Sequence, residues 1–124
     1  MKKHISQSLI VLLCAAARMT AGPKGDLLQR APASSQARVN PLEPTNDNRR
    51  AGNKLFLQEC AACHGREAMG KGKAPPLATP MVRKANPGTL FWILRNGALC
   101  HGMPSFAHLP EAERWQIITF LKTP

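Results

Sequence analysis

Cys60-Ala61-Ala62-Cys63-His64 is the stretch of sequence that decides the fold of this chain. Two cysteines separated by two residues and followed directly by a histidine form the attachment pattern of a c-type haem. In that chemistry both thiols bond covalently to the porphyrin, and the imidazole becomes one axial ligand of the iron. The motif therefore predicts that Cys60, Cys63 and His64 hold one covalent haem c.

Two other chemistries use the same residue types. A redox-active dithiol also reads Cys-x-x-Cys, but it belongs to a βαβ context, and no strand-rich run precedes Cys60. A structural zinc site needs four ligands, and Cys100 or His101 would be the fourth beside the motif. The residue count alone leaves zinc open, and haem is the preferred hypothesis.

The first 21 residues have the pattern of an export signal. Lys2 and Lys3 form a basic start, and residues 9–17 form an apolar run that small residues follow. The run is shorter than the roughly 20 apolar residues that span a bilayer. We expect 1–21 to be a cleaved signal peptide; a retained membrane anchor and a lipid on Cys14 are the alternatives.

A change of composition separates two further regions. Residues 22–47 are rich in Pro, Ser, Ala, Asn and Gln and contain few large apolar side chains. Such a segment buries too little surface to offset its loss of conformational entropy. We expect a flexible linker at 22–47 and a domain at 48–124; docking of the linker to a partner is the alternative.

The domain at 48–124 shows helical periodicity and no alternating strand pattern, which predicts an all-α fold. A first helix is expected from Asp47 or Asn48, a middle helix over 89–96, and a last helix from Pro110. A domain of about 77 residues has a small core of its own. A covalent macrocycle would supply the missing apolar surface.

The first and last predicted helices carry a matching set of side chains. Gly52 and Phe56 lie four residues apart and so share one face of the first helix, and Phe120 lies on the last helix. A glycine inside a helix costs about 0.5–1 kcal/mol relative to alanine, so a close approach is expected to require it. We expect Phe120 to pack against Gly52 and Phe56 where the helices cross.

The sixth ligand of a haem iron has to come from a distant part of the chain. Met103 is the best candidate because it lies between Gly102 and Pro104, and a soft thioether suits low-spin haem iron. Methionine is also a common core filler, and Met69 and Met81 compete for the role. His101 is the alternative ligand.

A ligating imidazole needs a partner for its second ring nitrogen. Pro75 offers a rigid carbonyl acceptor for His64, and Leu77 is placed to pack against the porphyrin. The alternative is a purely structural loop role for Pro75. The predicted cofactor contacts are thus Cys60, Cys63, His64, Pro75, Leu77 and Met103, with His64 and Met103 on the iron.

The chain is basic, with a formal net charge of +10 over 124 residues. No alternation of aromatic and basic side chains marks a nucleic-acid surface, so an acidic protein partner is the favoured interpretation of the charge. The basic side chains expected near the cofactor are Arg66, Lys71, Lys73, Arg83 and Lys84. Their alternative role is that of an ordinary solvated face.

Several motifs together resemble a small class I cytochrome c of the bacterial periplasm. They are Cys60–Gly65, Ala74-Pro75-Pro76-Leu77, Asn96-Gly97, Gly102–Phe106, and a last helix with Trp115 and Phe120. The resemblance implies three to four helices around one haem, His64 and Met103 as axial ligands, and a periplasmic location. It implies a monomeric one-electron carrier between a dehydrogenase or other donor and a terminal acceptor or oxidase.

The expected protein is not an enzyme, because two protein ligands on the iron leave no site for a substrate. Its partners would be redox proteins with an acidic docking surface. Two alternatives stay open: a haem peroxidase or gas-binding sensor with an open sixth site, and a c-type subunit of a periplasmic dehydrogenase complex.

Overall fold

The structure is a computed structural model that describes residues 26–124. Its elements are α2 (Asp26–Gln29), α3 (Ala33–Gln36), α4 (Asn46–Glu59), α5 (Ala61–His64), α6 (Pro80–Lys84), α7 (Pro87–Asn96), the 3₁₀ helix η1 (Leu99–His101) and α8 (Glu111–Lys122). These residues form no β-strand, so the predicted all-α fold is confirmed. The predicted signal peptide, 1–21, lies outside the described residues. Within 26–124 no helix combines the length and apolarity of a membrane span.

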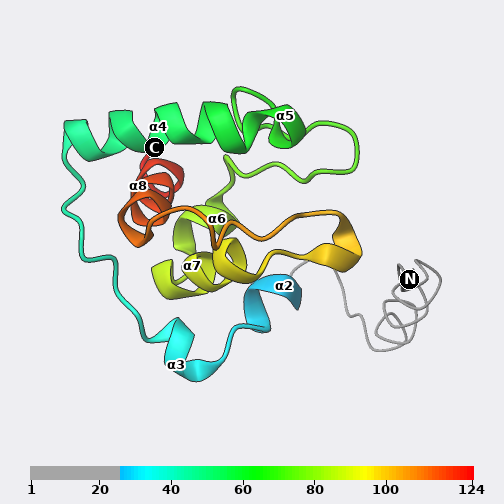
Figure 1. Ribbon diagram of the computed structural model, residues 1–124, viewed down its shortest axis with the longest axis horizontal. Helices are drawn as coiled ribbons and strands as arrows, with labels where there is room; N and C mark the ends of the chain where they lie inside the picture. The colour runs from blue at the N-terminus through cyan, green and yellow to red at the C-terminus, as the bar shows by residue number, and fades with distance from the viewer. Residues whose placement is uncertain (1–25) are drawn as a thin grey trace, which may run out of the picture.

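The long helices α4 and α8 cross and form the most extensive helix contact in the described part of the chain (Figure 1). A Cβ atom on Gly52 would lie 1.9 Å from the Gln116 carbonyl oxygen and 2.9 Å from the Phe120 Cβ. The rings of Phe56 and Phe120 pack with their centroids 5.3 Å apart. The crossing expected at Gly52, Phe56 and Phe120 is therefore present, and it requires the glycine.

The helix ends differ slightly from the sequence expectation. Thr45 caps α4, because its Oγ1 accepts a hydrogen bond from the Asn48 backbone N–H at 3.2 Å. α7 begins at Pro87, two residues before the start expected for the middle helix, so Thr89 is a buried residue inside the helix. Pro110 is the cap position of α8, which begins one residue later. A proline whose φ is already helical readily opens a helix, which explains the start of α7 at Pro87.

The main core lies between α7 and α8. Phe91 of α7 stacks on Trp115 of α8 with the ring centroids 4.1 Å apart, and both are almost fully buried. The cluster also contains Val82, Leu90, Leu94, Phe106, Leu109, Ile117 and Ile118. A second, smaller cluster gathers Phe56, Cys60, Ala61 and Ala68 at the end of α4. Leu77 and Leu121 contact both clusters and so join the two halves of the core.

Residues 26–45, which we call the N-terminal strap, pack against the helical domain. Ala31 is buried, and Leu28 and Leu42 contact the main core. The Asn40 side-chain amide donates to the Thr119 hydroxyl at 2.8 Å and also to a carbonyl oxygen of α8. This packing differs from the flexible linker expected for 22–47. That expectation rests on the small number of apolar residues, and it does not take account of contacts made by polar side chains.

The strap lies closely against α7. A Cβ atom on Gly88 would lie 1.9 Å from the Ser35 carbonyl oxygen and 2.7 Å from the Arg38 carbonyl oxygen. Figure 1 shows α2 and α3 beside α7, on the side of the molecule away from α4. The strap therefore covers a face of α7 and α8 and leaves the cysteine motif at the end of α4 uncovered.

Candidate haem attachment site

The two cysteines of the motif lie in one helical turn directly after α4. Cys60 lies between α4 and α5 and caps both helices, and the backbone N–H groups of Cys63 and His64 donate to the Cys60 carbonyl at 3.2 and 2.9 Å. Both thiols are free; Cys60 is buried and Cys63 is exposed. Burial, then the charges of Glu59 and Cys63, raise the pKa of the Cys60 thiol to about 11. The turn brings two thiols and an imidazole together on one short element.

The imidazole of His64 is held by the loop that follows the motif. Its Nδ1 lies 2.9 Å from the Pro75 carbonyl oxygen. Because a carbonyl only accepts, Nδ1 carries the proton, and the Nε2 lone pair is left available for a metal. This is the arrangement by which a second interaction fixes the tautomer and orientation of a ligating histidine. The structure thus brings His64 and Pro75 together as the sequence analysis expected.

Backbone hydrogen bonds fix the loop that carries Pro75. The Leu77 and Ala78 N–H groups both donate to the Ala68 carbonyl, at 2.7 and 2.9 Å, and the Gly70 N–H donates to the His64 carbonyl at 2.9 Å. Gly70 has a φ of +87°, and a Cβ there would lie 2.9 Å from the Pro76 nitrogen. The loop therefore returns to the motif, and it places Leu77 between the two core clusters.

Met103 lies in a closed loop after α7. Its backbone pairs with that of Ala98 through hydrogen bonds of 2.9 and 3.2 Å, and the chain beyond it is tied to α7 by the Phe106 N–H to Leu94 carbonyl bond at 2.8 Å. The side chain is partly buried and packs against the main core. Met103 is thereby presented from a loop fixed at both ends.

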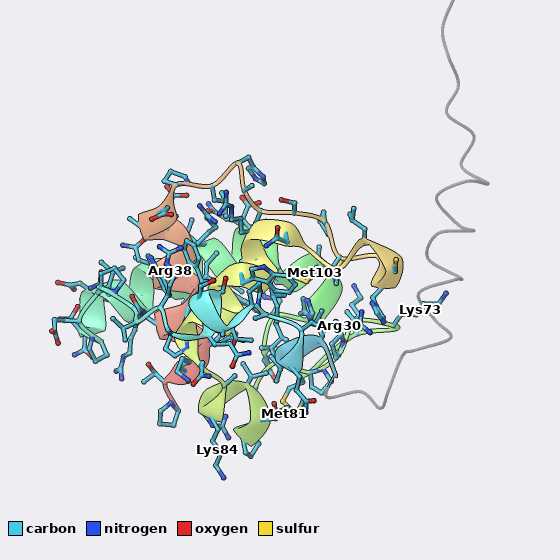
Figure 2. The ribbon with its side chains drawn as sticks, turned by 90° about the horizontal axis from the view of Figure 1, so that it is seen from below. Arg30, Arg38, Lys73, Met81, Lys84 and Met103 are labelled. Atoms are coloured by element: carbon cyan, nitrogen blue, oxygen red, sulfur yellow. The ribbon has the colours of Figure 1, made fainter. Side chains whose placement is uncertain are left out.

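The competing ligands lie in more exposed places. Met69 and Met81 are 64% and 51% exposed, and Figure 2 shows Met81 on α6 at the edge of the molecule. His101 is exposed in η1 and is not one of the two residues of the Ala98–Met103 backbone pair. Within 26–124 no three His, Cys, Asp or Glu side chains are close enough to hold a metal ion together. Cys100 and His101 thus do not complete a four-ligand cluster with the motif.

The basic residues do not gather on one patch. Arg66, Lys71, Lys73 and Lys84 are exposed, and Arg83 is partly buried. Figure 2 shows Lys73 and Lys84 at different edges of the molecule. The loop 66–79, which follows the motif in the sequence, holds three of the five, namely Arg66, Lys71 and Lys73.

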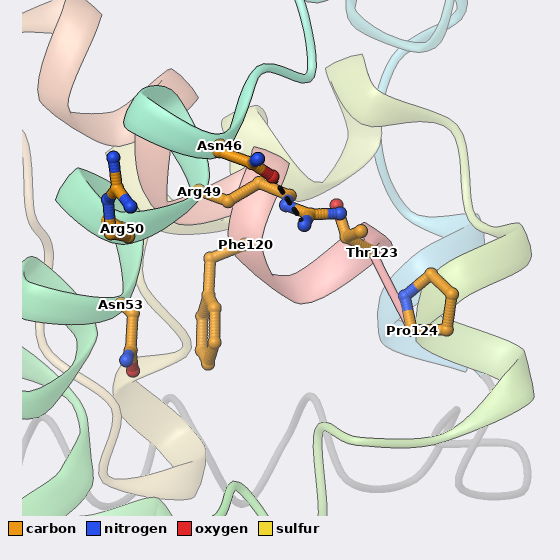
Figure 3. A pocket seen from close by; sticks show the side chains of 7 residues that line it. All are labelled: Asn46, Arg49, Arg50, Asn53, Phe120, Thr123 and Pro124. Carbon is orange, nitrogen blue, oxygen red and sulfur yellow. Dashed lines mark hydrogen bonds between the residues drawn. The ribbon is translucent and has the colours of Figure 1, made fainter.

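A surface pocket of about 440 Å³ lies at the opposite end of α4 from the motif (Figure 3). Its lining residues are Asn46, Arg49, Arg50, Asn53, Phe120, Thr123 and Pro124. Arg49 is bonded to Asn46 at 2.8 Å, as Figure 3 shows. This pocket contains none of the predicted cofactor residues.

Residues 47–121 match the protein family described as cytochrome C oxidase, cbb3-type, subunit III. The chain belongs to this family. It is a c-type cytochrome, which carries covalently bound haem c with its iron. No curated protein and no solved structure matches the chain significantly. The N-terminal strap lies outside the matched residues.

The residues of this cytochrome fit the cofactor that the family implies. Two unpaired thiols in one turn can bond to the porphyrin, and the hydrogen bond to Pro75 leaves Nε2 of His64 for the iron. The pattern Cys-x-x-Cys-His is sufficient to find these residues. The contribution of the strap was missed, because its contacts join residues far apart in the sequence.

Proposed function

We propose that this cytochrome is a periplasmic one-electron carrier and not an enzyme. The haem, once bound, supplies a centre that gains and loses one electron. The protein would hold it with Cys60 and Cys63 and fill both axial positions with His64 and Met103. With both ligands supplied by the protein, substrates and small gases would have no place on the iron, and the chain's residues would only hold the cofactor while it exchanges electrons.

The hydrogen bond between His64 Nδ1 and the Pro75 carbonyl is the observation that carries this proposal. It fixes the orientation of the imidazole, and a fixed ligand keeps its geometry when the oxidation state changes. The backbone pair of Ala98 and Met103 fixes the loop that would supply the second ligand. Rigid ligands favour electron transfer because little rearrangement accompanies it.

The proposed partners are redox proteins with acidic surfaces. Arg66, Lys71 and Lys73 are exposed in the loop that carries Pro75. Complementary charge raises association rates more than it raises final affinity. We expect the rate of electron exchange with an acidic partner to fall as the salt concentration rises, because salt screens charges beyond about 10 Å at 0.1 M.

A second candidate role is that of a subunit in a larger membrane or periplasmic redox complex. The family description names a subunit of a cbb3-type oxidase, which favours this role. The chemistry at the iron would be the same, and the protein would differ only in being bound to its partner. Size-exclusion chromatography of material purified from the native membrane and periplasm would separate a free carrier from a complexed subunit.

The ligand assignment is tested by replacing Met103 with alanine. A thioether raises the reduction potential of haem iron relative to a nitrogen ligand or water. Met103→Ala should lower the midpoint potential and remove the weak long-wavelength band of methionine-bound ferric haem. Met81→Ala is the matched control, because Met81 is an exposed methionine on α6, and it should leave both unchanged. A Met103→Ala protein with the wild-type potential would contradict the assignment.

A further inference from the structure

Arg114 is a buried arginine with two guanidinium nitrogens that lack a hydrogen-bond partner. Its side chain belongs to α8, the residue is only 6% exposed, and its Nε and Nη1 atoms are buried and make no hydrogen bond within the described part of the chain. Buried charges in proteins are nearly always paired, because removing an ion from water is costly. These two donors of Arg114 therefore need an acceptor that the described residues do not provide.

A second arginine lies on the same aromatic ring. The guanidinium carbons of Arg38 and Arg114 are each 4.4 Å from the centroid of the Phe91 ring, so they lie within about 9 Å of each other. Arg38 comes from the N-terminal strap and Arg114 from α8. Each contact with the ring stabilises one cation, but neither contact removes the repulsion between the two.

Few acidic side chains lie beside Arg38 and Arg114. Glu111 is the acid beside them, and its carboxylate lies 3.5 Å from Arg38 with both side chains substantially exposed. Burial lowers the pKa of Arg114, Glu111 raises it, and Arg95 and Arg38 lower it again. An arginine does not lose its proton in a protein, so the charge stays and an anion is the remaining way to balance it.

We propose that Arg38 and Arg114 form a binding site for an oxyanion, either a phosphate or a carboxylate, at the junction of the strap and α8. Such an anion can accept hydrogen bonds from two guanidinium groups at once, and guanidinium groups suit planar or tetrahedral oxyanions. Arg38 is the exposed partner, with 42% of its side chain open to solvent. The bound anion would link the strap to α8 and hold it closed.

Neither Arg38 nor Arg114 is among the residues proposed to hold the haem. In the view of Figure 2, Arg38 lies to the left of Met103 and Lys73 lies to its right. The proposal does not depend on axial ligation or on electron transfer. The anion has two sources, a free oxyanion such as phosphate or a carboxylate on a partner protein, and the experiment distinguishes them.

The test is the thermal stability of the haem-loaded full chain at pH 7 in three solutions of equal ionic strength. The solutions contain sodium chloride alone, inorganic phosphate, or a hexaglutamate peptide. We expect the melting temperature of wild type to rise by at least about 2 °C in one of the two oxyanion solutions relative to chloride. A rise with phosphate assigns a free oxyanion, and a rise with hexaglutamate alone assigns a partner carboxylate.

Three variants make the test specific. Arg114→Gln and Arg38→Gln should both abolish the rise, whereas Lys54→Gln, which removes an equal charge from an exposed position on α4, should keep it. In chloride, Arg114→Gln should melt no lower than wild type, because it removes a buried unpaired charge. The proposal is overturned if neither oxyanion stabilises wild type, or if the rise persists in both arginine variants.

Discussion

Replacing Gly97 with alanine should disturb the segment that presents Met103. Gly97 follows α7 with φ 71° and ψ −172°, a conformation that side chains strongly disfavour. A Cβ atom there would lie 2.7 Å from the Met103 carbonyl oxygen and 2.7 Å from the Pro104 carbonyl carbon. Both contacts are with backbone atoms, so no change of side-chain rotamer can relieve them.

Two costs add at this position. The backbone conformation costs of order 1–3 kcal/mol for a residue other than glycine. Moving the Met103 and Pro104 backbone costs about 1–3 kcal/mol more, as overpacking does elsewhere. Gly102 is the matched control: it also has a positive φ, +81°, but nothing lies within 4 Å of its Cβ position. Gly102→Ala should therefore cost only about 1–2 kcal/mol.

Thermal unfolding of the haem-loaded protein, followed by circular dichroism, measures the difference. A change of 1 kcal/mol shifts the melting temperature of a domain of this size by roughly 4–8 °C. We expect Gly97→Ala to melt at least about 8 °C below wild type, with a weakened methionine band in the ferric spectrum. Gly102→Ala should melt higher than Gly97→Ala and keep the band. Equal melting temperatures and equal spectra for the two variants would refute the reasoning.

Two further predictions concern α4 and the thiols. Gly52→Ala should lower the melting temperature of the haem-loaded protein by several degrees, because its Cβ would collide with the Gln116 carbonyl oxygen at 1.9 Å. Asn53→Ala, at the exposed neighbouring position, is the control and should leave the melting temperature unchanged. A Gly52→Ala protein as stable as wild type would show that the two helices do not meet at this residue. In haem-free protein that keeps its helical circular dichroism, iodoacetamide should alkylate exposed Cys63 at neutral pH well before Cys60, whose pKa is about 11. The Cys60 rate should rise with pH towards that value, and equal rates for both thiols at neutral pH would contradict the burial of Cys60.

Local patterns predict the parts of the site that lie close together in the sequence. Cys60, Cys63 and His64 form one helical turn, so their spacing alone determines their geometry. Pro75 is predictable because its missing N–H leaves only an acceptor, and the loop returns it to His64. Gly52 is predictable because a glycine within a helix is costly unless a neighbouring helix needs the space. In each case the residue type itself limits the structures it can form.

Contacts between distant segments are not predictable in this way. Asn40 bonds to residues 75 and 79 positions away, and nothing in its neighbourhood marks it as a helix-binding residue. Arg114 looks like a solvent-facing residue of an amphipathic helix, but it is buried and its guanidinium group lies over the Phe91 ring of α7. Burial of a polar side chain depends on tertiary packing, which composition and periodicity do not encode.

Exposure of the reduced haem-loaded protein to carbon monoxide tests the central claim most directly. If His64 and Met103 fill both axial positions, as we propose, the ferrous absorption spectrum should not change during minutes under one atmosphere of the gas. The Met103→Ala variant should bind carbon monoxide and so prove that the assay detects an open site. Rapid binding by the wild-type protein would contradict the claim that this cytochrome only carries electrons.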